Sequence, residues 1–124
     1  MTVILSIAAG GALGASLRHL LNTQILAAWG GTFPAGILAV NVLGCLIMGI
    51  AAGILAQGSS AELRAFLTTG VLGGFTTFSA FAYDAVFLAE GGRLTAAVGY
   101  VAGSVILSII ACALGLWLAR WVVS

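Results

Sequence analysis

Charged side chains are scarce in this chain, and lysine is absent altogether. Of 124 residues, four are arginine and three are acidic, so 6% of the chain is charged and the net charge is +1. A soluble domain carries about a quarter charged residues, because water must wet its surface. This shortage argues against a soluble globule, and without a basic run we expect no nucleic-acid partner.

Cysteine and proline are also rare, with two and one residues. Cys45 and Cys112 lie in apolar stretches and are interpreted as packing residues, so neither a disulfide framework nor a metal cluster is expected. No nucleotide-binding loop, His/Cys cluster or nucleophile–base pair is present, and we expect no enzyme. The N-terminus has no positive region ahead of its apolar run, which favours a retained first span over a cleaved signal peptide.

Hydrophobic residues make up 62% of the chain, and the mean hydropathy is +1.25. A helix needs about 20 apolar residues to cross the hydrocarbon core of a bilayer. Four stretches meet this requirement, and short glycine-rich or polar breaks separate them. We therefore predict an all-α, multi-pass protein of the cell membrane, with one four-span domain over residues 1–124. The expected spans are 3–29, 34–57, 62–90 and 93–123.

The arginines give no clear orientation in the membrane. Four spans place Arg64 and Arg120 on one side, and Arg93 and Arg18 on the other. The positive-inside rule depends on an asymmetry that is missing here, so insertion in both directions, and an antiparallel homodimer, is permitted. The alternative is that four arginines are too few to decide. Four helices also leave little room for a pore, which favours a transport path at the interface between two copies.

Glycine is abundant, with 18 residues, and recurs at a spacing of four. Small residues at this spacing allow helix backbones to approach closely in lipid. We therefore expect tight helix packing, within or between subunits. The pairs are Gly10/Gly14, Gly49/Gly53 and Gly99/Gly103.

The third span contains the least helical segment, in which Gly73 and Gly74 are soon followed by Thr76 and Thr77. Glycine and β-branched residues are poor helix formers, so we expect a broken third helix. An unwound segment in lipid must be buried or line a cavity, and its free carbonyl oxygens suit an ion such as Na⁺. The alternative is a glycine kink in which hydroxyl groups bond back to the helix.

Aromatic rings recur every three residues at Phe75, Phe78 and Phe81. This spacing is typical of core packing. Ring edges carry partial positive charge, however, and edges that point into a narrow passage would attract an anion without trapping it.

Hydroxyl groups recur on the fourth span at Tyr100, Ser104 and Ser108, a spacing of four that places them in one stripe. Such a stripe could replace the water shell of a dehydrated anion, or it could form interhelical hydrogen bonds. Asn41 is an isolated amide in the second span, with the same two possibilities. Arg18 suits either a vestibule that draws anions to the mouth or an interface anchor.

These motifs resemble those of the Fluc, or CrcB, fluoride channel family. The segment GGFTTFSAF, residues 73–81, is similar to that family's third-span signature, and AVNVLG around Asn41 is similar to its second-span motif. GGALGASLRHLL resembles its first-span glycine run leading to an arginine. The stripe on the fourth span resembles its polar track.

The resemblance implies an antiparallel, dual-topology homodimer with two fluoride paths, which exports fluoride passively and protects the cell from its toxicity. It also implies a structural Na⁺ that is not transported, held by the backbone carbonyls of Gly73 and Thr76 from both subunits. Arg18 would lie in the vestibule. The implied fluoride path comprises Asn41, Phe78, Ser79, Phe81, Tyr100, Ser104 and Ser108.

Three positions depart from the family pattern. Ala80 stands where threonine is usual, Asp84 where glutamate is common, and Phe75 where leucine is usual. None of them alters the asparagine, the later two phenylalanines or the stripe. We therefore expect function to survive, with the ion rate and halide preference less secure.

Two other functions compete with a fluoride channel. A small multidrug-type, proton-coupled exporter has a similar length and span count, but it needs a membrane acid to exchange a proton for its cationic substrate, and the first span has none. A non-transporting membrane subunit would depend on a larger partner. A self-sufficient dimer in detergent would weaken that second alternative.

Overall fold

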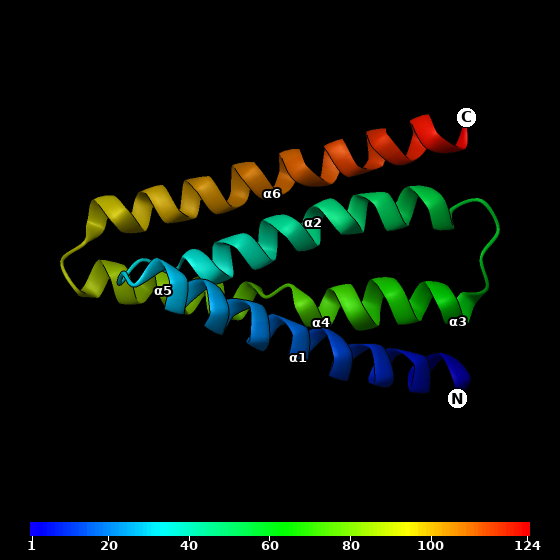
Figure 1. The fold of residues 1–124 in the computed structure, drawn as a ribbon, viewed down its shortest axis with the longest axis horizontal. Coiled ribbons are helices and arrows are strands. Elements are labelled where there is room, and N and C mark those ends of the chain that lie inside the picture. The colour runs from blue at the N-terminus through cyan, green and yellow to red at the C-terminus, as the bar shows by residue number, and fades with distance from the viewer.

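The computed structural model describes all residues from Met1 to Ser124 and is entirely helical. Four helical rods lie side by side along the long axis of the molecule, and the chain runs up and down through them (Figure 1). The first, second and fourth rods are single helices: α1 (Thr2–Trp29), α2 (Ala35–Leu55) and α6 (Leu94–Val123). All four rods are long and apolar enough to cross a membrane, which confirms the predicted four-span, all-α architecture.

The third rod is assembled from several pieces. It comprises α3 (Ala61–Arg64), the π-helical segment η1 (Ala65–Leu72), α4 (Gly73–Phe75) and α5 (Phe78–Glu90). Between α4 and α5, Thr76 and Thr77 are extended, with ψ angles of 155° and 120°. The ribbon narrows to a thin, non-helical link at this point, well inside the rod (Figure 1).

Short connections join the rods. Residues 30–34, 56–60 and 91–93 lie between them, and both termini lie at the same end as residues 56–60 (Figure 1). Gly30, with φ of 68°, ends α1 in the left-handed conformation that favours glycine. The second rod ends at Leu55, slightly before the predicted residue 57, because residues 56–58 form a turn.

Glycines set the contact between α1 and the third rod. A Cβ atom on Gly14 would overlap the backbone carbonyl of Val71, and one on Gly74 would lie 2.7 Å from the carbonyl oxygen of Gly11. The backbones therefore touch directly, as glycines at a spacing of four allow in lipid.

The most extensive helix contact joins α2 and α6. Gly49 packs against the backbone at Cys112, and Gly53 packs against Ala119. Two of the three predicted glycine pairs thus pack within one subunit. Nothing in the subunit lies within 4 Å of a Cβ atom built on Gly99 or Gly103, so this pair makes no such contact.

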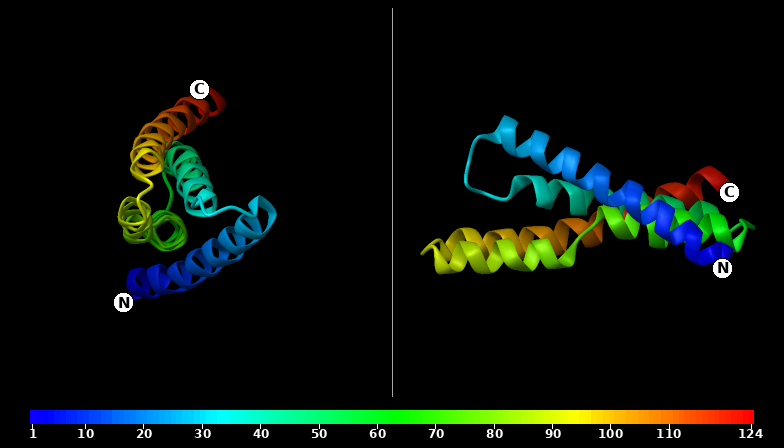
Figure 2. Two further views of the ribbon diagram at one scale, coloured as in Figure 1. Left: turned by 90° about the vertical axis from the view of Figure 1, so that its left-hand side faces the viewer. Right: turned by 90° about the horizontal axis from the view of Figure 1, so that it is seen from below.

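The surface of the bundle is largely apolar, and the two perpendicular views show its rods with no additional layer around them (Figure 2). Large hydrophobic side chains are exposed along every rod, among them Ile4, Ile47, Phe87 and Ile109. This is the distribution expected of a protein whose solvent is lipid.

Candidate functional site

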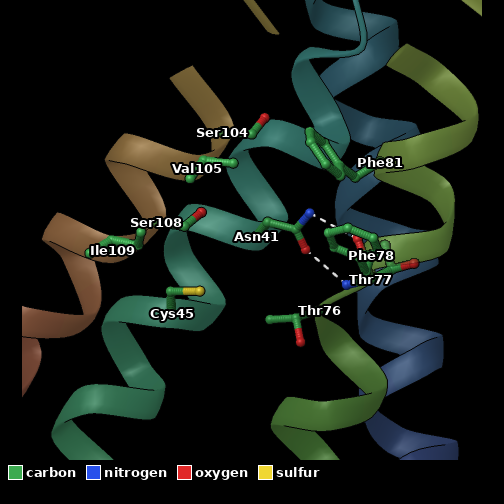
Figure 3. Close-up of a pocket in the computed structure, with 10 residues that line it drawn as sticks. All are labelled: Asn41, Cys45, Thr76, Thr77, Phe78, Phe81, Ser104, Val105, Ser108 and Ile109. Carbon is green, nitrogen blue, oxygen red and sulfur yellow. Dashed lines mark hydrogen bonds between the residues drawn. The ribbon is translucent and has the colours of Figure 1, made fainter. Parts of the chain in front are cut away.

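A cavity of about 280 Å³ lies beside the extended link, where α2 and α6 face the start of α5 (Figure 3). None of its ten lining residues carries a charge, and hydroxyl, amide and thiol groups share the wall with aromatic rings and aliphatic side chains. The lining residues are Asn41, Cys45, Thr76, Thr77, Phe78, Phe81, Ser104, Val105, Ser108 and Ile109.

Asn41 connects α2 to the extended link. Its Nδ2 donates to the Thr77 carbonyl oxygen at 3.0 Å, and the Thr77 amide donates to its Oδ1 at 2.8 Å (Figure 3). The side chain therefore pairs with both main-chain groups of one residue, as a neighbouring strand would. The structural role that the sequence left open for Asn41 is present, and its position in the cavity wall leaves a second Nδ2 hydrogen available to a ligand.

The link also frees two carbonyl oxygens. In a continuous helix the amide of Thr77 would bond to the Gly73 carbonyl, and that of Ala80 to the Thr76 carbonyl. Instead, the Thr77 amide donates to Asn41, and the Ala80 amide donates to Thr77 Oγ1 at 3.2 Å. Both carbonyls predicted to hold Na⁺ have thus lost their usual helical donors, so the available groups fit a hard cation.

The Thr76 hydroxyl bonds back to the Leu72 carbonyl at 3.0 Å. Hydroxyl back-bonding, which the sequence offered as an alternative to unwinding, therefore coexists with the extended backbone at Thr76 and Thr77.

Two aromatic rings form one side of the cavity. Phe81 is 8% exposed, whereas Phe78 is 79% exposed, and their ring centroids lie 5.5 Å apart. Because a lining residue is so exposed, the cavity opens onto the flank of the subunit. Phe75 is buried against Gly44 and takes no part in the cavity wall, as the packing interpretation predicts.

The hydroxyl stripe on α6 divides into two parts. Ser104 and Ser108 line the cavity. Ser104 is 5% exposed, and its hydroxyl has no hydrogen-bond partner. A buried polar group without a partner is costly, so this hydroxyl is suited to a ligand in the cavity.

Tyr100 lies four residues before Ser104 on α6 and is fully buried. Its hydroxyl donates to Asp84 Oδ2 on α5 at 3.3 Å, and its ring packs on Phe81 and Phe33 at centroid distances of 5.3 and 5.6 Å. Tyr100 therefore supports the phenylalanine wall from behind and does not line the cavity. Asp84 accepts this hydrogen bond from Tyr100, and no arginine pairs with it.

Two other predicted site residues lie outside the cavity. Ser79 is exposed, and its hydroxyl lies 3.3 Å from Thr77 Oγ1. Arg18 is half-buried on α1, away from the cavity wall.

The sequence did not indicate the roles of Cys45 and Thr77. Cys45 was interpreted as a packing residue, but its sulfur points toward the cavity (Figure 3). Its position four residues after Asn41 places both on one helix face, a signal that was available. Thr77 caps α5 through its hydroxyl, and its backbone is the partner of Asn41. Threonine is a known N-cap residue, but its cap can be recognised only once the helix start is fixed.

Comparison with known proteins shows the family of this chain. Residues 5–116 match the family described as "CrcB-like protein, Camphor Resistance (CrcB)". The chain is 48% identical over 118 residues to a protein of Mesorhizobium japonicum named fluoride-specific ion channel FluC, with 94% of this chain and 95% of the relative covered. Proteins of the same name from Paracoccus denitrificans and Chelativorans sp. are 49% and 51% identical, over 94% and 90% of this chain and 93% and 90% of their own lengths. The resemblance drawn from the motifs is thereby confirmed, and the chain belongs to the CrcB-like protein family.

Proposed function

We propose that this protein is a fluoride-selective ion channel of the cell membrane that lets fluoride leave the cell down its gradient. Relatives that are about half identical over nearly their whole length carry the name fluoride-specific ion channel. The observation that carries the proposal at the site is the unpartnered, buried hydroxyl of Ser104 in an uncharged cavity. A channel needs no catalytic group, and this function is not enzymatic.

The cavity suits a small anion stripped of its water. Removing such an ion from water costs tens of kcal/mol on an idealised estimate, so many weak donors must replace the water shell. Ser104, Ser108 and the free Nδ2 hydrogen of Asn41 offer such donors, and the ring edges of the two phenylalanines add partial positive charge. The absence of a full positive charge in the wall favours passage, because a bound anion must also leave.

The functional unit in this proposal is an antiparallel homodimer. Phe78 is 79% exposed at the mouth of a cavity that opens onto the flank, which is unfavourable for a path unless another surface closes it. A second copy in the opposite orientation would close both cavities and create two equivalent paths. The equal division of arginines between the two ends permits this arrangement.

A structural Na⁺ is the second part of the proposal. The carbonyls of Gly73 and Thr76 would hold it, because their usual helical donors are engaged elsewhere. Its charge would offset carbonyl dipoles that are otherwise unsatisfied in the membrane and would favour an anion nearby.

Proton-coupled export of cationic drugs is not favoured. The cavity contains no acid, and Asp84 is hydrogen-bonded to Tyr100 outside its wall.

The test is ion flux through the purified protein in liposomes loaded with potassium fluoride. After valinomycin is added, a fluoride electrode should record rapid efflux from the wild type, whereas chloride-loaded liposomes should retain their chloride. Phe81→Ile removes a ring edge from the wall and should slow efflux at least tenfold. A folded dimer that releases no fluoride in the presence of Na⁺ would refute the channel.

A further inference from the structure

The N-terminal end of α5 lies inside the bundle and not at a membrane surface. A helix leaves its first amide groups without intrahelical partners. In α5 these belong to the N-cap Thr77 and to the first three helical residues, Phe78, Ser79 and Ala80. In most spans the corresponding groups lie near water or lipid headgroups, but here they lie at the depth of the cavity.

Side chains satisfy two of these four amides. The Thr77 amide donates to Asn41 Oδ1, and the Ala80 amide donates to Thr77 Oγ1. The amides of Phe78 and Ser79 remain. A continuous helix would direct them to the carbonyls of residues 74 and 75, but the extended Thr76 and Thr77 carry the chain away from those groups.

A free amide at this depth needs a partner, because hydrocarbon offers none. The Ser79 hydroxyl does not cap the helix, since it lies against Thr77 Oγ1 at 3.3 Å. Thr77 and Phe78 both line the cavity, so the Phe78 amide lies beside it, whereas Ser79 is exposed and takes no part in the wall (Figure 3). Helix N-termini carry partial positive charge and bind anions through such amides.

An independent observation from the opposite wall points to the same occupant. Ser104 on α6 is 95% buried, lines this cavity and has no partner for its hydroxyl. The Phe78 amide on one side and the Ser104 hydroxyl on the other are both able to donate. A small anion satisfies such a set of donors.

We propose that the main-chain amide of Phe78 binds the permeating anion, so that the start of α5 is a binding site on the ion path. This inference rests on the proposed fluoride channel and adds a backbone donor to its side chains. It gives the extended link a direct role in anion binding, because a continuous helix would engage this amide in a helical hydrogen bond.

The test replaces a single amide and leaves the side chain intact. Phe78→phenyllactic acid converts the amide of residue 78 to an ester, which has no N–H but keeps the ring; the Thr77 carbonyl still accepts from Asn41, although more weakly. Loss of one charge-assisted hydrogen bond should lower fluoride efflux about tenfold to a hundredfold. The rise in Tm on adding fluoride should shrink in parallel, and that readout requires no conduction.

Phe87→phenyllactic acid is the matched control. Phe87 lies in the interior of the same helix, 65% exposed and away from the cavity, so its ester removes a helical hydrogen bond and weakens the preceding carbonyl as an acceptor, but touches no cavity group. We expect its efflux to stay within about twofold of the wild type. Unchanged efflux and Tm response in the residue-78 ester, or equal losses in both esters, would overturn the inference.

The two proposals can fail separately. If the wild type conducts fluoride and the residue-78 ester conducts equally well, the channel is supported and anion binding by the amide is refuted. If the wild type does not conduct, but fluoride raises its Tm and this rise is lost in the ester, anion binding by the amide is supported and the channel is refuted. A wild type with neither response overturns both.

Discussion

Asn41 shows how one side chain serves both structure and site. Its amide pairs with both main-chain groups of Thr77, which holds α2 against the link between α4 and α5. The same pairing keeps the Thr77 amide away from the Gly73 carbonyl and positions the free end of α5 at the cavity. The conformation of the third rod therefore depends on a residue of the second.

Asn41→Asp tests this dual role. A carboxylate cannot donate to the Thr77 carbonyl, and it places negative charge in a cavity suited to anions. We expect fluoride efflux to fall at least a hundredfold and the free energy of unfolding to fall by about 1–3 kcal/mol. Efflux assays and thermal unfolding in detergent would measure the two effects.

Gln57→Glu is the control for Asn41→Asp, because it makes the same chemical change at an exposed position in a connection. It should behave as the wild type in both assays. An Asn41→Asp protein that conducts fluoride normally would show that neither the pairing nor the neutrality of this site matters.

At the scale of helices, glycine contacts determine how closely α1 approaches the third rod. Gly14 packs directly on the backbone of Val71 and Phe75, so no side chain there can move aside to make room. This close contact between α1 and the third rod therefore fixes the position of α4, which leads into the extended link.

We expect Gly14→Ala to push α1 away from the third rod. The added methyl group meets rigid backbone, and overpacking of this kind typically costs about 1–3 kcal/mol. Thermal unfolding should show a lower Tm. Gly11→Ala is the control from the same helix, since nothing lies within 4 Å of its added methyl group, and it should leave the Tm unchanged or raised. Equal effects of the two substitutions would contradict the direct backbone contact.

The sequence predicted the rods well because hydropathy alone determines which stretches can cross a bilayer. It also located the unusual segment of the third rod, since glycine and threonine disfavour a helix there. It did not predict the π-helical stretch Ala65–Leu72. The residues of that stretch read equally well as α-helix, and nothing in their composition distinguishes the two forms.

The site was predicted less completely, for a physical reason. Spacing on α6 placed Tyr100 in one stripe with Ser104 and Ser108, but spacing describes only one helix. Asp84 on α5 accepts a hydrogen bond from the Tyr100 hydroxyl, and the ring of Phe81 packs against the ring of Tyr100. Which hydroxyl remains free depends on neighbours that only the folded structure brings together.

At the scale of the whole molecule, the four arginines are divided equally between the two halves of the bundle. Arg64 in α3 and Arg120 near the end of α6 lie toward the end that holds both termini, whereas Arg93 lies at the other end and Arg18 in the half of α1 nearer to it. The three connections are short, and none holds a folded domain that would fix the orientation of the chain in the membrane. We therefore expect the molecule to have little preference for one direction in the membrane.

Labelling from one side of the membrane tests this expectation. Single cysteines at Gln57 and Gly91 lie in connections at opposite ends, while the natural Cys45 and Cys112 lie within the spans. A membrane-impermeant maleimide applied to intact cells should label about half of the chains at each position. Complete labelling at one position and none at the other would show a single orientation and exclude an antiparallel dimer.

Apart from the terminal residues, only the connections at residues 30–34, 56–60 and 91–93 lie outside the four rods. Proteases need loosely held backbone, which usually occurs at loop tips. Arg93, the one arginine in a connection, is tied by its guanidinium group to the Thr32 hydroxyl of a neighbouring connection. We therefore expect the folded protein to resist proteases that digest soluble contaminants.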